Sequence, residues 1–192
     1  MDVKCDFLYN KQNLSVSEIR TENYLRLDNV EYFVSYLSSD YKSNKGGNSF
    51  VYALYEAQTY DEDAIPAKVI KISKFHESYK NGKIRTKDKN KRFRQEVAAL
   101  YDCKRKHVGN VIDIESDGNL ICCTRKDGDY EVSFPFYVME YAEFDLKGFL
   151  EEENEAYDEA SRVELCLQIA QGIKELNDLG YYHRDIKPDN IF

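Results

Sequence analysis

The sequence predicts an α+β fold in which a small antiparallel β-sheet with one helix precedes a long helix. Two observations support this prediction. Short runs of aromatic and β-branched residues, bounded by turn-forming residues, are typical of strands. They cover residues 32–37, 65–72, 108–114, 120–123, 133–140 and a run that starts at 49, with turns at 117–119 and 127–129. Apolar residues that recur every three or four positions from Leu165 to Leu176 share one face of a helix.

The composition is that of a folded protein. The chain has 192 residues, of which 42% are hydrophobic, enough for one domain or for a small lobe plus part of a larger one. Its formal net charge of −8 argues against a nucleic-acid partner, because most of the surface would repel phosphate backbones.

Cysteine usage and apolar runs bear on the compartment. The five cysteines are an odd number without any Cys-x-x-Cys pair, so they indicate neither a disulfide framework nor a zinc site. No apolar run of about 18 residues occurs, and the first ten residues lack an apolar core of signal-peptide length. We therefore predict a cytoplasmic chain without a membrane span.

A turn rich in small residues lies between the first two predicted strands. It contains Gly46 and Gly47 and leads through Ser49 to Val51. Small residues let backbone N–H groups approach phosphate oxygens closely, so the turn is a candidate phosphate-binding loop. An ordinary hairpin turn uses the same residue types, and the turn alone does not separate the two interpretations.

Two lysines in the next strand compete for one role as a phosphate-binding cation. If Lys68 held that role, Pro66 would lie in the interior of a central strand, where proline removes a ladder hydrogen bond. Lys71 avoids this conflict, and a period of two places Val69 on the same face as Lys71. We therefore favour Lys71 and keep Lys68 as the alternative.

The helix predicted between the strands carries an acidic residue within its apolar stripe. The stripe consists of Phe93, Glu96, Val97, Leu100 and Tyr101. A carboxylate that faces a core is costly unless it is paired, so Glu96 is expected to have a cationic partner, for which Lys71 is the candidate. The alternative is that Glu96 lies at the edge of the stripe and reaches water.

The long helix is predicted to start at the capping box 161–164 and to end at Gly180. It leads into a short stretch where an acid at Asp185, a cation at Lys187 and a carboxamide at Asn190 are closely spaced. These three groups can serve one phosphate–metal complex as a base for a hydroxyl, a charge for a phosphoryl oxygen and a metal ligand. Their spacing therefore predicts phosphoryl transfer.

The pattern His183-Arg184-Asp185-x-Lys187-x-x-Asn190 resembles the catalytic loop of protein kinases, and its lysine is similar to that of the serine/threonine subclass. The turn at 44–52 resembles the glycine-rich loop of that family, although Asn44 and Ser49 stand where two of its glycines are expected. From about residue 32 onward, the motifs follow the order of a eukaryotic-type serine/threonine protein kinase.

This resemblance implies ATP and Mg²⁺ as cofactors and a protein serine or threonine hydroxyl as the acceptor. In the catalytic loop, it implies that Asp185 accepts or orients the hydroxyl proton, that Lys187 steadies the γ-phosphate and that Asn190 binds magnesium. Arg184 is implied to pair with a phosphorylated activation loop.

Around the nucleotide, the resemblance implies that Lys71 holds the α- and β-phosphates and that Glu96 orients Lys71. Met139 is implied to be the gatekeeper, and backbone groups from Glu140 to Ala142 to bond the adenine edge at a hinge. The residues expected around the nucleotide are Gly46, Gly47, Ser49, Val51, Val69, Lys71, Glu96, Met139, Glu140 and Ala142.

The resemblance divides the chain into an N-terminal extension (1–30), a kinase small lobe (31–139), and a hinge with the start of the large lobe (140–192). The sequence stops two residues after Asn190, before the Asp-Phe-Gly segment with which the family binds magnesium. We therefore expect a truncated kinase domain with an incomplete helical lobe, weak activity alone and uncovered apolar helix faces.

Two other functions stay open. A non-catalytic kinase-like module would bind nucleotide or partners without turnover, and the departures at Asn44 and Ser49 favour it slightly. A phosphotransferase that acts on a small molecule would share the same chemistry. Separately, the chain is basic from Lys74 to Lys106, and residues 79–91 within this stretch are either a solvated loop or a docking surface for an acidic partner.

Overall fold

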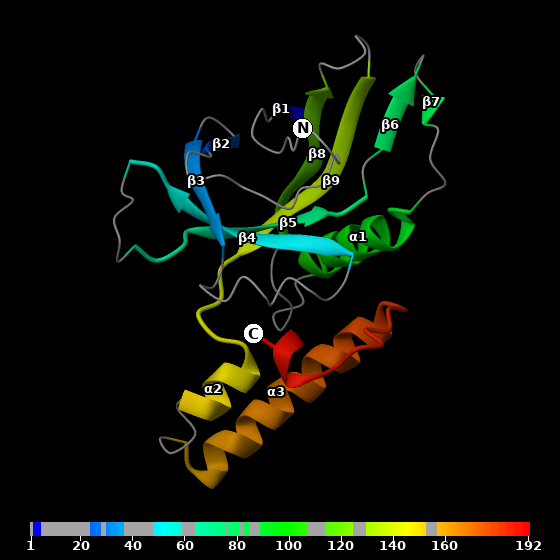
Figure 1. The fold of residues 1–192 in the computed structure, drawn as a ribbon. Helices are drawn as coiled ribbons and strands as arrows, with labels where there is room; N and C mark the ends of the chain where they lie inside the picture. The colour runs from blue at the N-terminus through cyan, green and yellow to red at the C-terminus, as the bar shows by residue number, and fades with distance from the viewer. Residues whose placement is uncertain are drawn as a thin grey trace. The chain divides into compact units, whose positions relative to one another are not determined.

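The computed structural model describes residues 2–4, 24–27, 30–36, 48–58, 64–75, 77–80, 83–84, 89–106, 114–124, 130–152 and 157–192. The chain forms two compact units, which are described separately (Figure 1). The first unit spans Met1–Val97 and Glu115–Tyr141, and the second spans Ala98–Ile114 and Ala142–Phe192. Almost all of the strand residues belong to the first unit.

The described strands form one sheet. They are β1 (Asp2–Lys4), β2 (Tyr24–Leu27), β3 (Val30–Tyr36), β4 (Ser49–Glu56), β5 (Lys68–Ser73), β6 (Glu77–Lys80), β7 (Lys83–Ile84), β8 (Ile114–Thr124) and β9 (Tyr130–Glu140). Their order is β1-β8-β9-β5-β4-β3-β2, and β6 pairs with β7 and β9. The pairs from β2 to β5, and those of β9 with β5 and β6, are antiparallel, as predicted, whereas β1 runs parallel to β8.

One face of the sheet forms the hydrophobic core. Strand residues alternate between two faces, so Ile70 and Ile72 of β5 lie on the core face, and Lys71 and Ser73 lie on the other. The core residues are Leu25, Leu27, Tyr32, Val34, Tyr52, Leu54, Ile70, Ile72, Phe134, Phe136 and Val138. All of them come from strands, so the sheet buries this face against its own side chains.

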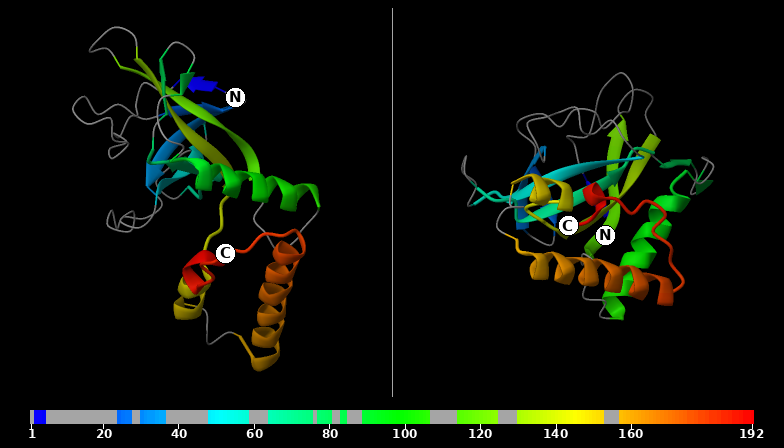
Figure 2. Two further views of the ribbon diagram at one scale, coloured as in Figure 1. Left: turned by 90° about the vertical axis from the view of Figure 1, so that its right-hand side faces the viewer. Right: turned by 90° about the horizontal axis from the view of Figure 1, so that it is seen from below.

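The first turns of α1 (Lys91–Arg105) lie against the opposite face of the sheet, as Figure 2 shows. Phe93 is buried there, and its ring packs against Tyr137 of β9 with 5.5 Å between the ring centroids. The burial predicted for the apolar stripe of this helix is confirmed at Phe93. Tyr101, which was predicted to belong to the stripe, is exposed, whereas Cys103 is buried. The last turns of α1 belong to the second unit.

The second unit contains α2 (Leu146–Glu152), α3 (Glu159–Asp178) and the short 3-10 helix η3 (Pro188–Asn190). Asp158 caps α3, because its carboxylate accepts a hydrogen bond from the Ser161 N–H at 2.8 Å. Gly180 follows the helix with a φ of 84°, a left-handed conformation that favours glycine, so the predicted end of the helix is confirmed. Among the described residues, no helix combines the length and apolar character that crossing a membrane requires.

Two local predictions are wrong. The turn expected at 117–119 lies inside β8, where Asn119 pairs with Asp2. The start of α3 lies at Glu159, because Asp158 rather than Ser161 supplies the capping oxygen. The strand residues predicted at 108–113 and the turn at 127–129 lie outside the described residues.

The N-terminal residues, for which the sequence predicted no elements, supply β1 and β2. Leu25 and Leu27 of β2 are core residues, and Tyr24–Leu27 pairs along its length with β3. The basic stretch after β5, predicted as a solvated loop or a docking surface, contains the β6–β7 hairpin.

Candidate active site

An ion pair joins β5 to α1 in the first unit. The Lys71 Nζ lies 2.5 Å from the Glu96 Oε1, and the two side chains are 23% and 41% exposed. The pairing predicted from the position of Glu96 in its helix is therefore confirmed. The pair presents an ammonium group, held at a fixed position on the sheet, to any anion that binds this face.

Tyr137 of β9 makes a third contact in this cluster. Its hydroxyl donates a hydrogen bond to the Glu96 Oε1 at 2.9 Å, and the Lys71 Nζ lies 5.6 Å from the centre of its ring. Burial, and secondly the negative charge of Glu96, raise the pKa of Tyr137 far above the ordinary tyrosine value. Tyr137 therefore stays protonated and donates to Glu96 throughout the neutral range.

Sequence reasoning missed Tyr137, although a signal was present. Residues on alternate positions of a strand share a face, so Tyr137 shares the face of Met139, which had been singled out. The observed register places Tyr137 directly opposite Lys71.

The strand register gathers further predicted residues on the Lys71 face. Lys71 pairs with Val51 of β4 on one side, and the neighbouring row runs from Ala53 through Val69 to Met139. Directly paired residues share a face of the sheet. Three predicted nucleotide residues, Val51, Val69 and Met139, therefore lie beside Lys71, and they make an apolar strip next to a cation.

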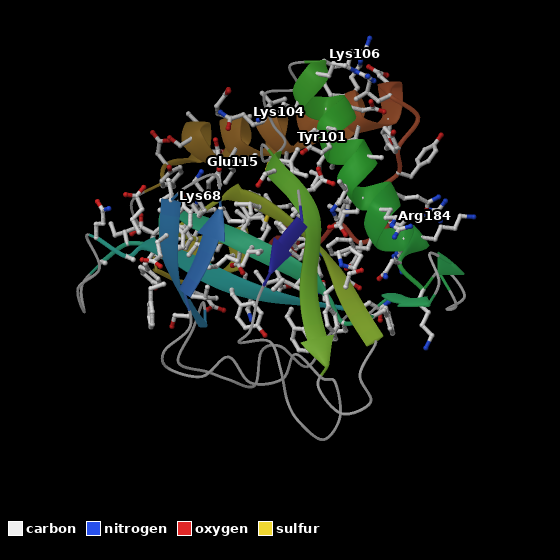
Figure 3. The ribbon with its side chains drawn as sticks, turned by 90° about the horizontal axis from the view of Figure 1, so that it is seen from above. Lys68, Tyr101, Lys104, Lys106, Glu115 and Arg184 are labelled. Atoms are coloured by element: carbon white, nitrogen blue, oxygen red, sulfur yellow. The ribbon has the colours of Figure 1, made fainter. Side chains whose placement is uncertain are left out.

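Lys68 lies on the opposite, core face of β5. It forms an ion pair with Glu115 of β8, and both side chains are labelled in Figure 3. A cavity of about 210 Å³ adjoins this pair, with Leu27, Tyr32 and Val138 in its lining. That cavity therefore lies away from the Lys71–Glu96 pair.

The second unit holds the predicted catalytic loop. The Asn190 Nδ2 donates hydrogen bonds to the Asp185 carbonyl oxygen at 2.8 Å and to the Asp185 Oδ2 at 3.0 Å. With its nitrogen directed at Asp185, the amide leaves its oxygen to face a cation. An oxygen ligand beside a carboxylate fits Mg²⁺, which prefers such ligands together with phosphate oxygens.

The remaining loop residues are exposed and held by backbone contacts. The Asn190 N–H donates to the Lys187 carbonyl at 2.9 Å, and the Ile191 carbonyl accepts from the first residue of α2, Leu146, at 2.7 Å. Arg184 has a φ of 65°, an unusual value for a residue with a side chain. The side chains of Arg184, Asp185 and Lys187 all face solvent.

Of the other residues expected around the nucleotide, the structure describes some and not others. Ser49 begins β4, Glu140 ends β9, and Ala142 follows in the second unit. Gly46 and Gly47 lie outside the described residues.

A comparison with protein families settles the relationship. The family model of the protein kinase domain matches residues 44–192, which is most of the chain. The chain belongs to the protein kinase family. The kinase fold expected from the motifs is confirmed by this match together with the antiparallel sheet and its helix.

Curated relatives of this kinase chain are similar over parts of their length. "Cyclin-dependent kinase G1" of Arabidopsis thaliana is 27% identical over 150 residues, which are 78% of this chain and 21% of that protein. "Serine/threonine-protein kinase PRR2" of Saccharomyces cerevisiae is 33% identical over 95 residues, 46% of this chain and 13% of that protein. "Cyclin-dependent kinase G-1" of Oryza sativa subsp. indica is 43% identical over 56 residues, 29% and 8% of the two chains. The chain thus spans between 8% and 21% of the length of these relatives.

Replacing Tyr137 with phenylalanine should lower the free energy of unfolding of this kinase chain by about 1 kcal/mol, because one hydrogen bond to Glu96 is lost. Folding raises the Tyr137 pKa, so its contribution is full below the unfolded pKa of about 10 and is lost as pH rises toward the folded value. Urea unfolding of Y137F and wild type at neutral and alkaline pH measures both effects. If Y137F and wild type had the same free energy of unfolding and the same change of that free energy with pH in the alkaline range, Tyr137 would not stabilise the cluster.

Proposed function

We propose that the protein transfers the γ-phosphoryl group of ATP to serine or threonine hydroxyls of protein substrates. The observation that carries this proposal is the pair of hydrogen bonds from the Asn190 amide to Asp185. They hold a carboxylate base and a metal-ligand oxygen together in one short loop. An attack by a hydroxyl on a metal-bound phosphate needs this combination.

The catalytic loop supplies the base and the charge. Asp185 accepts the proton of the substrate hydroxyl while the oxygen of that hydroxyl attacks the γ-phosphorus. The bond from the γ-phosphorus to the bridging oxygen then breaks, and ADP departs with that electron pair. Lys187 places an ammonium group two residues after the base, where it neutralises negative charge on the γ-phosphoryl oxygens.

Most of the nucleotide contacts come from residues of the first unit. Lys71, held by Glu96 and by the nearby Tyr137, binds the α- and β-phosphates. The apolar strip at Val69 and Met139 on the same face receives the adenine, and backbone groups from Glu140 to Ala142 bond its edge. Gly46 and Gly47, in the turn predicted from the sequence, and Ser49 after them contribute backbone groups to the phosphates.

Magnesium supplies charge neutralisation on the triphosphate when it is bound. Asn190 would hold it through the amide oxygen, together with oxygens of the phosphates. Arg184, which is exposed beside the base, would bind a phosphorylated residue of an activation loop.

The test is an assay with ATP labelled in the γ-phosphate, using the protein expressed from its complete gene and a mixture of protein acceptors. Acid hydrolysis of the labelled protein and separation of the amino acids identify the acceptor group. The proposal expects phosphoserine or phosphothreonine. Label found only on tyrosine, only on a small molecule, or on no acceptor would contradict it.

A further inference from the structure

A buried polar contact joins the end of β5 to the start of α1. Ser73 and Asn90 are both 1% exposed, and the Ser73 hydroxyl donates to the Asn90 amide oxygen at 2.5 Å. The Asn90 amide nitrogen donates to the Phe75 carbonyl at 3.0 Å, and the Phe75 N–H donates to the Ser73 hydroxyl oxygen at 3.1 Å. We call Ser73, Phe75 and Asn90 the β5–α1 clasp.

The clasp includes the N-terminus of α1 itself. Asn90 directly precedes the helix, and its carbonyl accepts the first helical hydrogen bond, from the Arg94 N–H at 2.9 Å. A second contact joins the same two segments, because the Lys89 Nζ lies 5.5 Å from the centre of the Phe75 ring. The start of the helix is therefore tied to β5 through a side chain, a backbone group and a ring.

The intervening chain does not fix the helix by its length. Ser73 and Asn90 are 17 residues apart in sequence, and a stretch of that length can span up to about 56 Å when fully extended, so its length alone does not bring the two residues together. In the described residues, β6 pairs with β9, and β7 pairs with β6 alone. These pairings attach β6 and β7 to the sheet, but they do not attach the start of α1. The clasp supplies that attachment.

The clasp and the Lys71–Glu96 pair lie on the same two elements. Ser73 shares the face of Lys71 and lies about 7 Å along the strand, since each strand residue advances about 3.3 Å. Asn90 precedes Glu96 by about 9 Å along the helix, at 1.5 Å per residue. The two contacts therefore attach α1 to β5 at two separate points, which fixes the direction of the helix as well as its distance.

We propose that Ser73 and Asn90 are positioning residues: the clasp holds α1 against β5 so that Glu96 meets Lys71. The inference rests on the proposed role of that ion pair in nucleotide binding. Breaking the clasp removes a hydrogen bond between two buried side chains, which is more costly than losing an exposed contact. The helix start is then expected to separate from β5, with Glu96 withdrawn from Lys71.

The first test measures the attachment without reference to activity. Amide hydrogen exchange across residues 91–97 is compared in wild type, S73A and S133A. Ser133 is a matched control, because it is 2% exposed in the same sheet and its hydroxyl has no hydrogen-bond partner within the described residues. We expect exchange in S73A to be faster by about tenfold, and exchange in S133A to be unchanged.

A second variant guards against failure of S73A to fold. Asn90→Ala removes both the oxygen that accepts from Ser73 and the donor to the Phe75 carbonyl without burying a charge, so exchange in this variant should rise by at least as much as in S73A. Wild-type exchange rates across 91–97 in both variants would overturn the proposal, whatever their activity.

The second test asks whether the clasp acts through Glu96. ATP affinity is measured by calorimetry for wild type, S73A, E96Q and the double variant. A positioning role predicts that S73A weakens ATP binding by about tenfold alone and adds little in the E96Q background. Equal weakening in both backgrounds would overturn it. Wild-type affinity of E96Q would instead contradict the proposed role of the ion pair, and the exchange measurement would still decide whether the clasp holds α1.

Discussion

Replacing Lys71 with methionine is expected to lower phosphate transfer by at least about 100-fold, the usual cost of removing one group that stabilises charge in a transition state. Methionine keeps much of the length and the apolar stem of lysine but has no ammonium group to hold phosphate oxygens. Glu96 then loses its cationic partner, although the Tyr137 hydroxyl still donates to it. The measurement is the initial rate of transfer from labelled ATP.

Lys68→Met is the matched control for this prediction. Lys68 also lies on β5, also pairs with a glutamate, and its side chain is 31% exposed compared with 23% for Lys71. It lies on the core face, so its loss should change the transfer rate by no more than about twofold and the stability by less than about 1 kcal/mol. The reverse pattern, with K68M inactive and K71M active, would show that the phosphate-binding lysine is Lys68.

Replacing Asp185 with alanine is expected to lower the turnover number by about 1,000-fold, within the range that general base catalysis contributes. ATP affinity should stay near the wild-type value, because Asp185 acts on the acceptor hydroxyl and not on the adenine or the α-phosphate. Asn190 loses one of the two oxygens that orient its amide, since only the Asp185 carbonyl remains. A lower affinity for Mg²⁺ is therefore expected as well.

Asp189→Ala serves as the control for Asp185→Ala. Asp189 lies in the same loop and is exposed, and its replacement removes the same charge while keeping both hydrogen bonds from the Asn190 amide to Asp185. Transfer by D189A should stay close to wild type. If D185A transferred phosphate at the wild-type rate, or if D189A lost activity equally, Asp185 would not be the base.

The face of β5 on which each lysine lies could be predicted from the sequence because it depends on local rules. A strand alternates its faces, and proline is excluded from central ladder positions, so Pro66 and a period of two favoured Lys71 over Lys68 as the phosphate-binding lysine, and that assignment stays a prediction. The need of Glu96 for a partner followed from its place in an apolar stripe, and the structure supplies Lys71. Both arguments needed only neighbouring residues.

The clasp and the Tyr137 contact could not be predicted in the same way. Ser73 and Asn90 are separated by a hairpin of other residues, and Tyr137 is separated from Glu96 by 41 positions. Contacts of this kind depend on how the helix packs on the sheet, which no local period encodes. The start of α3 was predicted wrongly for a different reason: Asp158 and Ser161 are both good capping residues, and Asp158 supplies the capping oxygen.

One measurement tests the central claim most directly, namely that Lys71 and Lys187 hold the phosphates of one nucleotide. An ATP analogue whose terminal phosphate carries a reactive acyl group transfers that group to a nearby lysine amine and releases the nucleotide. Mass spectrometry of the digested protein then identifies the modified lysines. The account predicts acylation of Lys71 and Lys187, both suppressed by excess ATP and Mg²⁺, with Lys68 unmodified. Acylation of Lys68 in place of Lys71, or labelling that excess ATP does not reduce, would contradict it.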